Sequence, residues 1–114
     1  MNVKIVADST SDLPAAVVRE LGIAVVPALV QFGDKVYQDG IDLSTDEFYR
    51  RLQSSSVMPK TSAPSPGTFK EVYSRLAQEA DAIVSIHVSA KMSATYDAAR
   101  VGSADLKCPI SIID

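Results

Sequence analysis

The chain has 114 residues, of which 46% are hydrophobic and 22% charged, so its size suits one globular domain with a buried core. Its net charge of −3 and its lack of Lys and Arg clusters argue against nucleic acid or an anionic membrane surface as partners. No apolar stretch has the length of a membrane span or of a signal peptide. Cys108 is the only cysteine, which excludes an internal disulfide, and we expect a cytoplasmic protein.

The chain opens with a pattern typical of a strand that leads into a helix. Residues 3–7 form a short apolar run, and the polar residues 8–12 follow it, with Asp12 as the predicted helix cap. Apolar side chains at helical spacing then predict a helix that begins at Leu13 and stops at Gly22.

Residues 23–40 predict an irregular region. The run 23–32 is rich in Val, Ala and Leu but contains Pro27, which favours an edge strand or a bulged strand over a central one. Turn signals at 33–34 and 39–40 flank the next short run and predict a small hairpin-like excursion.

A capping-box pattern that begins at Ser44 predicts a second helix from Thr45. The polar stretch 54–66 contains prolines and has no period, so it predicts a long loop. Ser65 as the N-cap and Pro66 at the first helical position then predict the start of the third helix.

Strand and helix alternate in the last third of the chain. Residues 81–88 predict a buried strand, residues 94–106 a helix and residues 109–113 a further apolar strand. The alternation predicts an α/β fold, a three-layer domain with a mainly parallel sheet and helices on both faces. The end of the chain, 112–114, echoes residues 6–8, which a loop and a helix follow. We therefore expect a fragment, the first domain of a longer protein, with a genuine terminal strand as the alternative.

Two hydroxyl-rich loops, 60–67 and 89–96, each precede a predicted helix. Helix starts carry unpaired N–H groups and partial positive charge, so hydroxyls placed there favour a carboxylate or a phosphate. Ligands collect at the carboxyl ends of parallel strands, and we expect these loops and residues 8–12 to meet there. The loops supply neutral donors and no strong nucleophile or base, which indicates a binding site formed by Thr61, Ser62 and Ser93.

Other interpretations stay open at this point. Ser93 is also suited to cap a helix and Thr61 to order its own loop, which would leave a ligand-free interaction domain. A serine hydrolase that uses Ser93 and His87 is the enzymatic alternative, although a glycine-flanked nucleophile elbow is absent and His87 lies in an apolar strand, which favours a packed core histidine. Residues 8–12 offer oxygen ligands for magnesium but lack the second carboxylate of an aspartyl phosphotransferase.

Three motifs occur in order along the chain: Val-Ala-Asp-Ser-Thr-Ser-Asp-Leu-Pro at 6–14, Tyr-Gln-Asp-Gly at 37–40 and Thr-Ser-Ala-Pro-Ser-Pro-Gly at 61–67. Together they resemble the amino-terminal domain of the DegV family, the bacterial fatty-acid-binding proteins. The resemblance covers the whole sequence. It implies a DegV-like fold and a long-chain fatty acid as the ligand, without a metal or another cofactor.

The resemblance also implies roles for individual residues. In the family, hydroxyls of the third motif and of a Ser-Gly-Thr motif hold the fatty-acid carboxylate, so Thr61 and Ser93 take these roles here, with Ser62, Thr95 and Ala94 beside them. Ala94 replaces the family glycine, which a helical first position tolerates and a positive φ does not. Candidates for the apolar wall of the pocket are Val26, Pro27 and Met92.

Family members have a carboxyl-terminal domain that completes the pocket, and a fatty-acid kinase phosphorylates the bound acyl group. By resemblance we expect a carrier rather than an enzyme. It would hold the fatty acid by its carboxylate and present it to that kinase for acyl-phosphate formation and phospholipid synthesis. A monomer and a dimer formed through the exposed inter-domain face are both compatible with the sequence.

Overall fold

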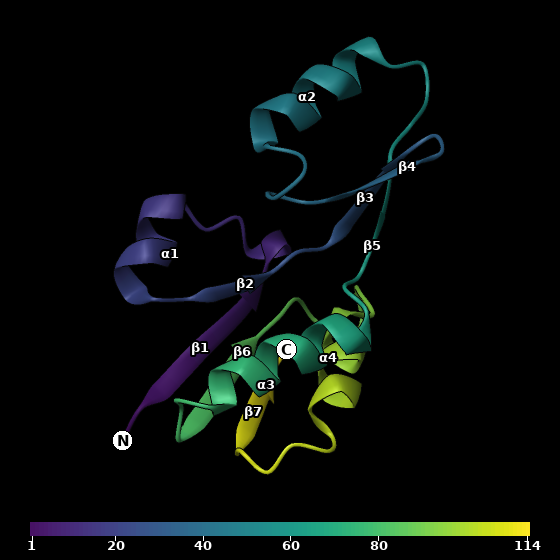
Figure 1. Cartoon of the computed structure of the whole chain (residues 1–114). Helices are drawn as coiled ribbons and strands as arrows, with labels where there is room; N and C mark the ends of the chain where they lie inside the picture. Colours follow the sequence, from purple (N-terminus) through teal and green to yellow (C-terminus); the bar gives the residue numbers. More distant parts are fainter.

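In the computed structural model, which describes residues 1–114, four parallel strands form the central sheet in the order β2-β1-β6-β7 (Figure 1). Their bounds are β1 Val3–Asp8, β2 Ala24–Val26, β6 Ala82–Ile86 and β7 Ile110–Ile113. The predicted parallel α/β architecture is therefore confirmed. The predicted edge strand is β2, which lies at one side of the sheet and ends just before Pro27.

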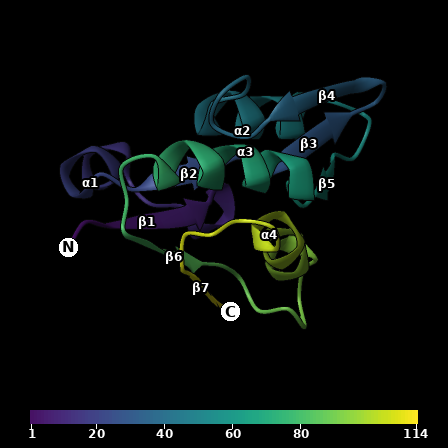
Figure 2. The same ribbon diagram turned by 60° about the horizontal axis from the view of Figure 1, so that its bottom comes forward.

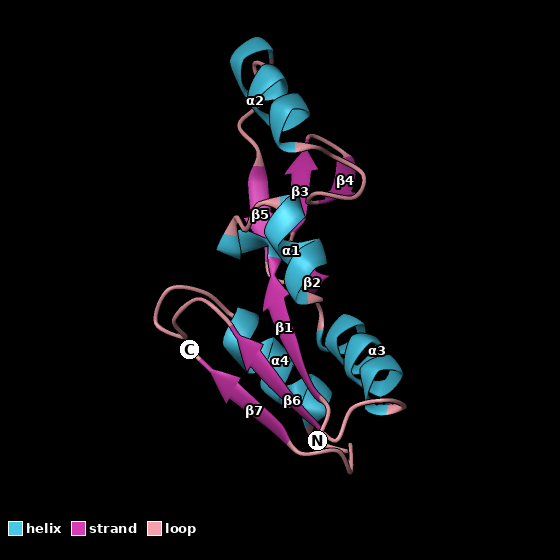
Figure 3. Cartoon of the chain, turned by 90° about the vertical axis from the view of Figure 1, so that its left-hand side faces the viewer, coloured by secondary structure: helices cyan, strands magenta, loops and turns pink.

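Helices lie on both faces of this sheet, which confirms the predicted layers. On one face α3 (Pro66–Ala77) packs beside α4 (Thr95–Ser103), as Figure 2 shows. The crossover from β1 to β2 through α1 (Ala15–Leu21) runs in the direction opposite to the crossover from β6 to β7 through α4. Right-handed crossovers in opposite directions place their helices on opposite faces, and Figure 3 shows α1 and α4 on the two sides of the strands.

The middle of the chain forms a smaller lobe that projects from the α/β body (Figure 1). Here β3 (Leu29–Phe32) pairs antiparallel with both β4 (Lys35–Gln38) and β5 (Lys60–Ser62), so the predicted hairpin is present. The helix α2 (Thr45–Ser54) begins where the capping box predicts, because the Ser44 hydroxyl accepts the Glu47 N–H. The rings of Phe32 and Phe48, 6.0 Å apart, join the helix to this sheet.

Long-range pairing changes two of the predicted elements. The run 23–32 is two strands in different sheets rather than one, because Pro27 separates β2 from β3. The stretch 54–66 is not simply a loop, since β5 lies inside it and pairs with β3 at Thr61 and Val30. All three residues of β5 are exposed, so no alternation of polar and apolar side chains marks this strand in the sequence.

Two helix boundaries also differ from the prediction. Asp12 does not cap a helix: it ends a 3₁₀ turn, Ser9–Ser11, with a left-handed φ of 52°. Pro14 instead takes the N-cap position of α1 without a side-chain hydrogen bond, and Gly22 ends the helix as predicted. The last helix, α4, is shorter than the predicted span 94–106.

The core lies between the sheet and the pair α3 and α4, and it consists of Val6, Val26, Phe69, Tyr73, Ile83, Ala98 and Ala99. The two helices approach so closely that only a glycine fits at one contact. A Cβ atom on Gly102 would lie 2.6 Å from the carbonyl oxygen of Pro66 and 2.8 Å from the Cβ of Phe69. Close backbone approach therefore requires glycine at this position.

A chain of hydrogen bonds runs through the same core and joins α3, β6 and β1. The Tyr73 hydroxyl donates to Ser85 Oγ at 2.7 Å, and Ser85 Oγ lies 2.5 Å from His87 Nε2. His87 Nδ1 lies 2.6 Å from the carboxylate of Asp8. Ser85 Oγ has two lone pairs, so beside the proton from Tyr73 it can either accept a proton from Nε2 or donate its own to Nε2. Toward the ionised Asp8, which has no proton to give, Nδ1 is the donor.

Hydrogen bonds keep the buried Asp8 ionised. Burial alone would raise its pKa, but the bonds from His87 and from the Thr10 hydroxyl and N–H outweigh this effect, and the pKa lies below its ordinary value of 3.8. Burial raises the pKa of Tyr73, which the bond to Ser85 offsets in part, so the phenol keeps its proton. The Asp8 carboxylate is therefore the charged acceptor at one end of the network, and the Tyr73 phenol is the donor at the other end.

The close contact between α3 and α4 yields a first prediction. Gly102→Ala should lower the free energy of unfolding by about 1–3 kcal/mol, the usual cost of overpacking, because backbone atoms of α3 have to move. Chemical denaturation measures this change. Gly67→Ala is the matched control, since a Cβ there meets only Ser65 Oγ at 3.8 Å. Equal stability of the two variants would contradict the contact.

The lowered pKa of Asp8 yields a second prediction. The unfolded chain takes up a proton at this carboxylate before the folded chain does. Its stabilising contribution is therefore present above about pH 3.8 and is lost as the pH falls through the lower folded-state pKa. Asp8→Asn should make the free energy of unfolding less dependent on pH below 3.8, as acid denaturation will show. Asp34→Asn, in an exposed turn, is the control and should retain the original profile.

Candidate functional site

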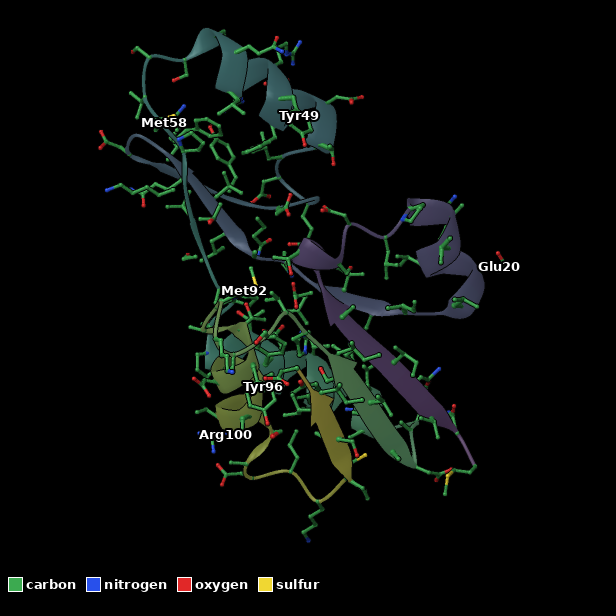
Figure 4. The ribbon with its side chains drawn as sticks, turned by 180° about the vertical axis from the view of Figure 1, so that it is seen from behind. Glu20, Tyr49, Met58, Met92, Tyr96 and Arg100 are labelled. Carbon is green, nitrogen blue, oxygen red and sulfur yellow. The ribbon has the colours of Figure 1, made fainter.

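Three segments that are distant in the sequence meet at the carboxyl ends of β1 and β6 and supply all the polar residues that line a cavity of about 400 Å³. They are the turn after β1, the strand β5 with the residues after it, and the loop between β6 and α4 with the first residue of that helix. Figure 4 shows Met92, from the third segment, where the upper lobe meets the α/β body. The lining residues are Thr10, Ala28, Thr61, Ser62, Ala63, Met92, Ser93, Ala94 and Thr95.

All five residues predicted for the site therefore lie around one cavity: Thr61, Ser62, Ser93, Ala94 and Thr95. The antiparallel pairing of β5 with β3 brings Thr61 to the cavity, and the crossover that follows β6 brings Ser93 there. The structure thus supplies the geometry that the binding hypothesis requires. Their roles toward a ligand stay predictions.

The loop before α4 is ordered by its own hydrogen bonds. The N–H groups of Met92 and Ser93 both donate to the carbonyl of Ser89, at 2.9 and 3.1 Å. Ser93 Oγ accepts the Thr95 N–H at 3.2 Å and lies 2.8 Å from the Thr95 hydroxyl. Ser93 is therefore held both by a turn and by the first residue of the helix.

Alanine fits the backbone at the position where the family motif has glycine. Ala94 occupies the N-cap position of α4 with a φ of −76° and a ψ of 0°. This conformation is open to every L-residue, so the backbone here does not require glycine. The Ala94 methyl group becomes part of the cavity lining instead.

The cavity lining is uncharged and rich in hydroxyl groups. Its polar members are Thr10, Thr61, Ser62, Ser93 and Thr95, and the amino-terminal end of α4 lies at the cavity, since Ala94 and Thr95 are in its lining. A helix start adds partial positive charge, which favours an anion. Hydroxyl donors beside such a helix start are suited to hold a carboxylate without transforming it.

The predicted apolar wall is correct in one position of three. Met92 lines the cavity, whereas Val26 is a fully buried core residue and Pro27 lines a separate groove beside α1. The predictions for Val26 and Pro27 were wrong because β2 ends at Val26 and the chain turns away from the sheet there. Ala28 and Ala63 provide apolar surface in their place.

The hydrolase alternative is wrong, because its serine and its histidine do not meet. His87 is only 6% exposed and its Nε2 is bonded to Ser85, which confirms it as a packed core histidine. The Ser93 hydroxyl is bonded to Thr95 and has no basic partner. Ser85 is fully buried and therefore cannot reach a substrate.

Two further observations concern metal ligands and membrane-spanning helices. No group of three or more His, Cys, Asp or Glu side chains gathers at a place where it could hold a metal ion. Asp8, which the magnesium hypothesis used, faces His87 and Thr10. None of the helices has both the length and the apolar character needed to cross a membrane.

Thr10 is the polar lining residue for which no individual role was predicted from the sequence. Its hydroxyl and its N–H both donate to Asp8 Oδ1, the N–H at 2.9 Å. The available signal was its position two residues after the aspartate that ends a buried strand, in a segment expected at this edge of the sheet. The hydrogen bonds from Thr10 to the core depend on the position of the Asp8 side chain, which cannot be read from the sequence.

Comparison with known proteins identifies related chains that are much longer. A DegV domain-containing protein of Halalkalibacterium halodurans is 43% identical over 98 residues, which make up 85% of this chain and 35% of that protein. This chain therefore spans less than half of the length of that relative.

Two solved structures share the whole fold of this chain. A DegV family protein of Thermus thermophilus, described as fatty-acid binding, superimposes with a TM-score of 0.89 at 33% identity and covers 100% of this chain and 41% of that one. A Thermotoga maritima protein with a described fatty-acid-binding function gives a TM-score of 0.91 at 32% identity, with 100% and 42% covered.

The family model that matches describes uncharacterised proteins of the DegV family, and the match extends over residues 2–114. Nearly the entire chain is thus accounted for by one family, in agreement with the three sequence motifs and with the fold. The chain belongs to the DegV family.

Proposed function

We propose that the chain is the head-group-binding part of a fatty-acid carrier that holds a long-chain fatty acid by its carboxylate and presents it to a fatty-acid kinase. The kinase would form the acyl phosphate that enters phospholipid synthesis. The observation that carries the proposal is the convergence of Thr61, Ser62 and Ser93 on one cavity at the start of α4. Two similar structures described as fatty-acid binding support a fatty acid as the ligand.

The chemistry of the lining favours carriage over catalysis. Thr61 and Ser93 come from different segments of the cavity lining, and each can donate a hydrogen bond to a carboxylate oxygen. Neither hydroxyl has a basic partner that would activate it as a nucleophile. A carboxylate bound here keeps its own reactivity, which suits an acceptor for a phosphoryl group delivered by another protein.

The free energies of tail burial and of hydrogen bonding to the carboxylate indicate different roles for the two ends of the fatty acid. Burial of about fourteen methylene groups at roughly 0.8 kcal/mol each gives on the order of 11 kcal/mol before association costs. Each hydrogen bond to the carboxylate adds about 1.5–3 kcal/mol. The tail therefore provides most of the affinity, while Thr61 and Ser93 decide which end of the ligand faces the kinase.

We also propose that residues 1–114 form the amino-terminal domain of a cytoplasmic protein, and that a second domain completes the pocket. The support is an apolar face of the parallel sheet. Val3, Ile86 and Ile113 share the face opposite α3 and α4 and are 43%, 47% and 48% exposed. Parallel sheets are normally covered on both faces, so this surface is suited to a further layer.

Replacement of the central hydroxyl tests the proposal. In the intact protein, Ser93→Ala should reduce kinase-dependent formation of the acyl phosphate more than it reduces lipid retention, because it removes a head-group donor and leaves the tail contacts. Native mass spectrometry measures the retained fatty acid. A phosphoryl-transfer assay with the kinase measures presentation.

Ser103→Ala is the matched control, since this hydroxyl lies at the other end of α4 and bonds to the carbonyl of Arg100. Unchanged transfer by Ser93→Ala would count against Ser93 as a head-group residue. If the intact, unchanged protein binds no fatty acid, the carrier function is wrong and the interaction-domain alternative is favoured.

A further inference from the structure

One lining residue connects the cavity to the charge in the core. Asp8 is 1% exposed and does not line the cavity, but Thr10 does, and both the hydroxyl and the N–H of Thr10 are bonded to Asp8 Oδ1. The other carboxylate oxygen of Asp8 faces His87 Nδ1 at 2.6 Å. Thr10 therefore stands between a buried negative charge and the space that a ligand would occupy.

The direction of the hydrogen bond from Thr10 follows from the charge of its partner. An ionised carboxylate has no proton to give, so the Thr10 hydroxyl donates to Asp8. His87 Nδ1 faces the other oxygen of Asp8, so donors already occupy both carboxylate oxygens. The only hydrogen-bonding groups that Thr10 Oγ1 has left for the cavity are lone pairs.

The hydroxyl groups that line the cavity are consequently of two kinds. Thr61, Ser62 and Ser93 have hydroxyl protons that can turn toward a ligand, whereas the Thr10 hydroxyl proton is used on the Asp8 carboxylate and leaves an acceptor. A carboxylate head has two oxygens that the donors can hold. A phosphate head has three terminal oxygens and about two negative charges above pH 7, so it brings more negative charge near Thr10 and Asp8.

We propose that Thr10, held by Asp8, makes this cavity select a singly charged carboxylate head over a doubly charged phosphate head, an inference that rests on the proposed fatty-acid-binding function. Thr10 is thus a specificity residue rather than one more donor. This selection affects what the carrier retains. The cavity binds the fatty acid more tightly than it binds the phosphorylated form that the kinase produces.

Two ligands with the same alkyl chain test this inference, because the contribution of the tail cancels between them. The intact protein is titrated with stearic acid and with heptadecyl phosphate at pH 8, each below its micelle concentration, and the two dissociation constants are compared. We expect the unchanged protein to bind stearic acid about tenfold more tightly, the scale of one partly screened charge interaction.

Thr10→Asn converts the acceptor at this position into a donor. The asparagine amide carries two N–H groups, so one can replace the bond to Asp8 while the second faces the cavity. The preference for stearic acid should fall severalfold toward equality. Thr10 is exposed, so the substitution leaves the core intact, which circular dichroism checks. Ser11→Asn introduces the same amide at a residue that does not line this cavity and should retain the original preference.

The outcomes distinguish the role of Thr10 from the proposed fatty-acid-binding function. Equal affinity of the unchanged protein for both ligands, or an unaltered preference in Thr10→Asn, overturns the role of Thr10 and leaves the fatty-acid-binding function standing. If the unchanged protein binds neither ligand, the proposed function is wrong and the inference is overturned with it.

Discussion

The hydrogen bond between His87 Nδ1 and Asp8 is the contact on which the rest of the structure depends. It joins β6 to β1, the two central strands, and it partners one oxygen of the buried Asp8 carboxylate, while Thr10 is bonded to the other oxygen. A hydrogen bond to a charged group contributes about 1.5–3 kcal/mol, so the two strands are fixed relative to each other by more than their backbone ladder. Tyr73 extends the same network to α3 through Ser85.

The three cavity segments leave from elements that this network ties together. Thr10 is bonded directly to Asp8, the loop that carries Ser93 follows His87, and the segment that carries Thr61 leads into α3, where Tyr73 lies. Because the network is fully hydrogen-bonded, it can define one arrangement of these elements without leaving an unpaired polar group. The hydrogen-bonded network in the core therefore determines where the hydroxyl groups lie around the cavity.

Features that depend on local chemistry were predictable from the sequence. The caps at Ser44 and Ser65 and the stop at Gly22 each need only a few neighbouring residues, and the structure has all three. The strand β5 was not predictable, because its exposed residues are ordered by pairing with β3, about thirty positions earlier in the chain. The general rule for parallel sheets predicted that Ser93 and residues 8–12 lie at the same end of the sheet. It did not predict the arrival of Thr61, which depends on the pairing of β5 with β3, and the role of Thr10 required knowledge of the contact between Asp8 and His87, 79 residues apart.

The order of hydrogen bonds from Ser85 through His87 to Asp8 is the order found in serine hydrolases, yet here it is a structural device. A nucleophile has to reach a substrate, and Ser85 has no exposed surface and accepts a hydrogen bond from Tyr73. The spacing of Ser85 and His87 places both side chains on the same face of one strand, which was visible in the sequence. The two uses of this triad differ in how deeply its side chains are buried. In the core, the triad fixes the strands relative to each other. The groups that can contact a ligand are the hydroxyls that line the cavity outside the core.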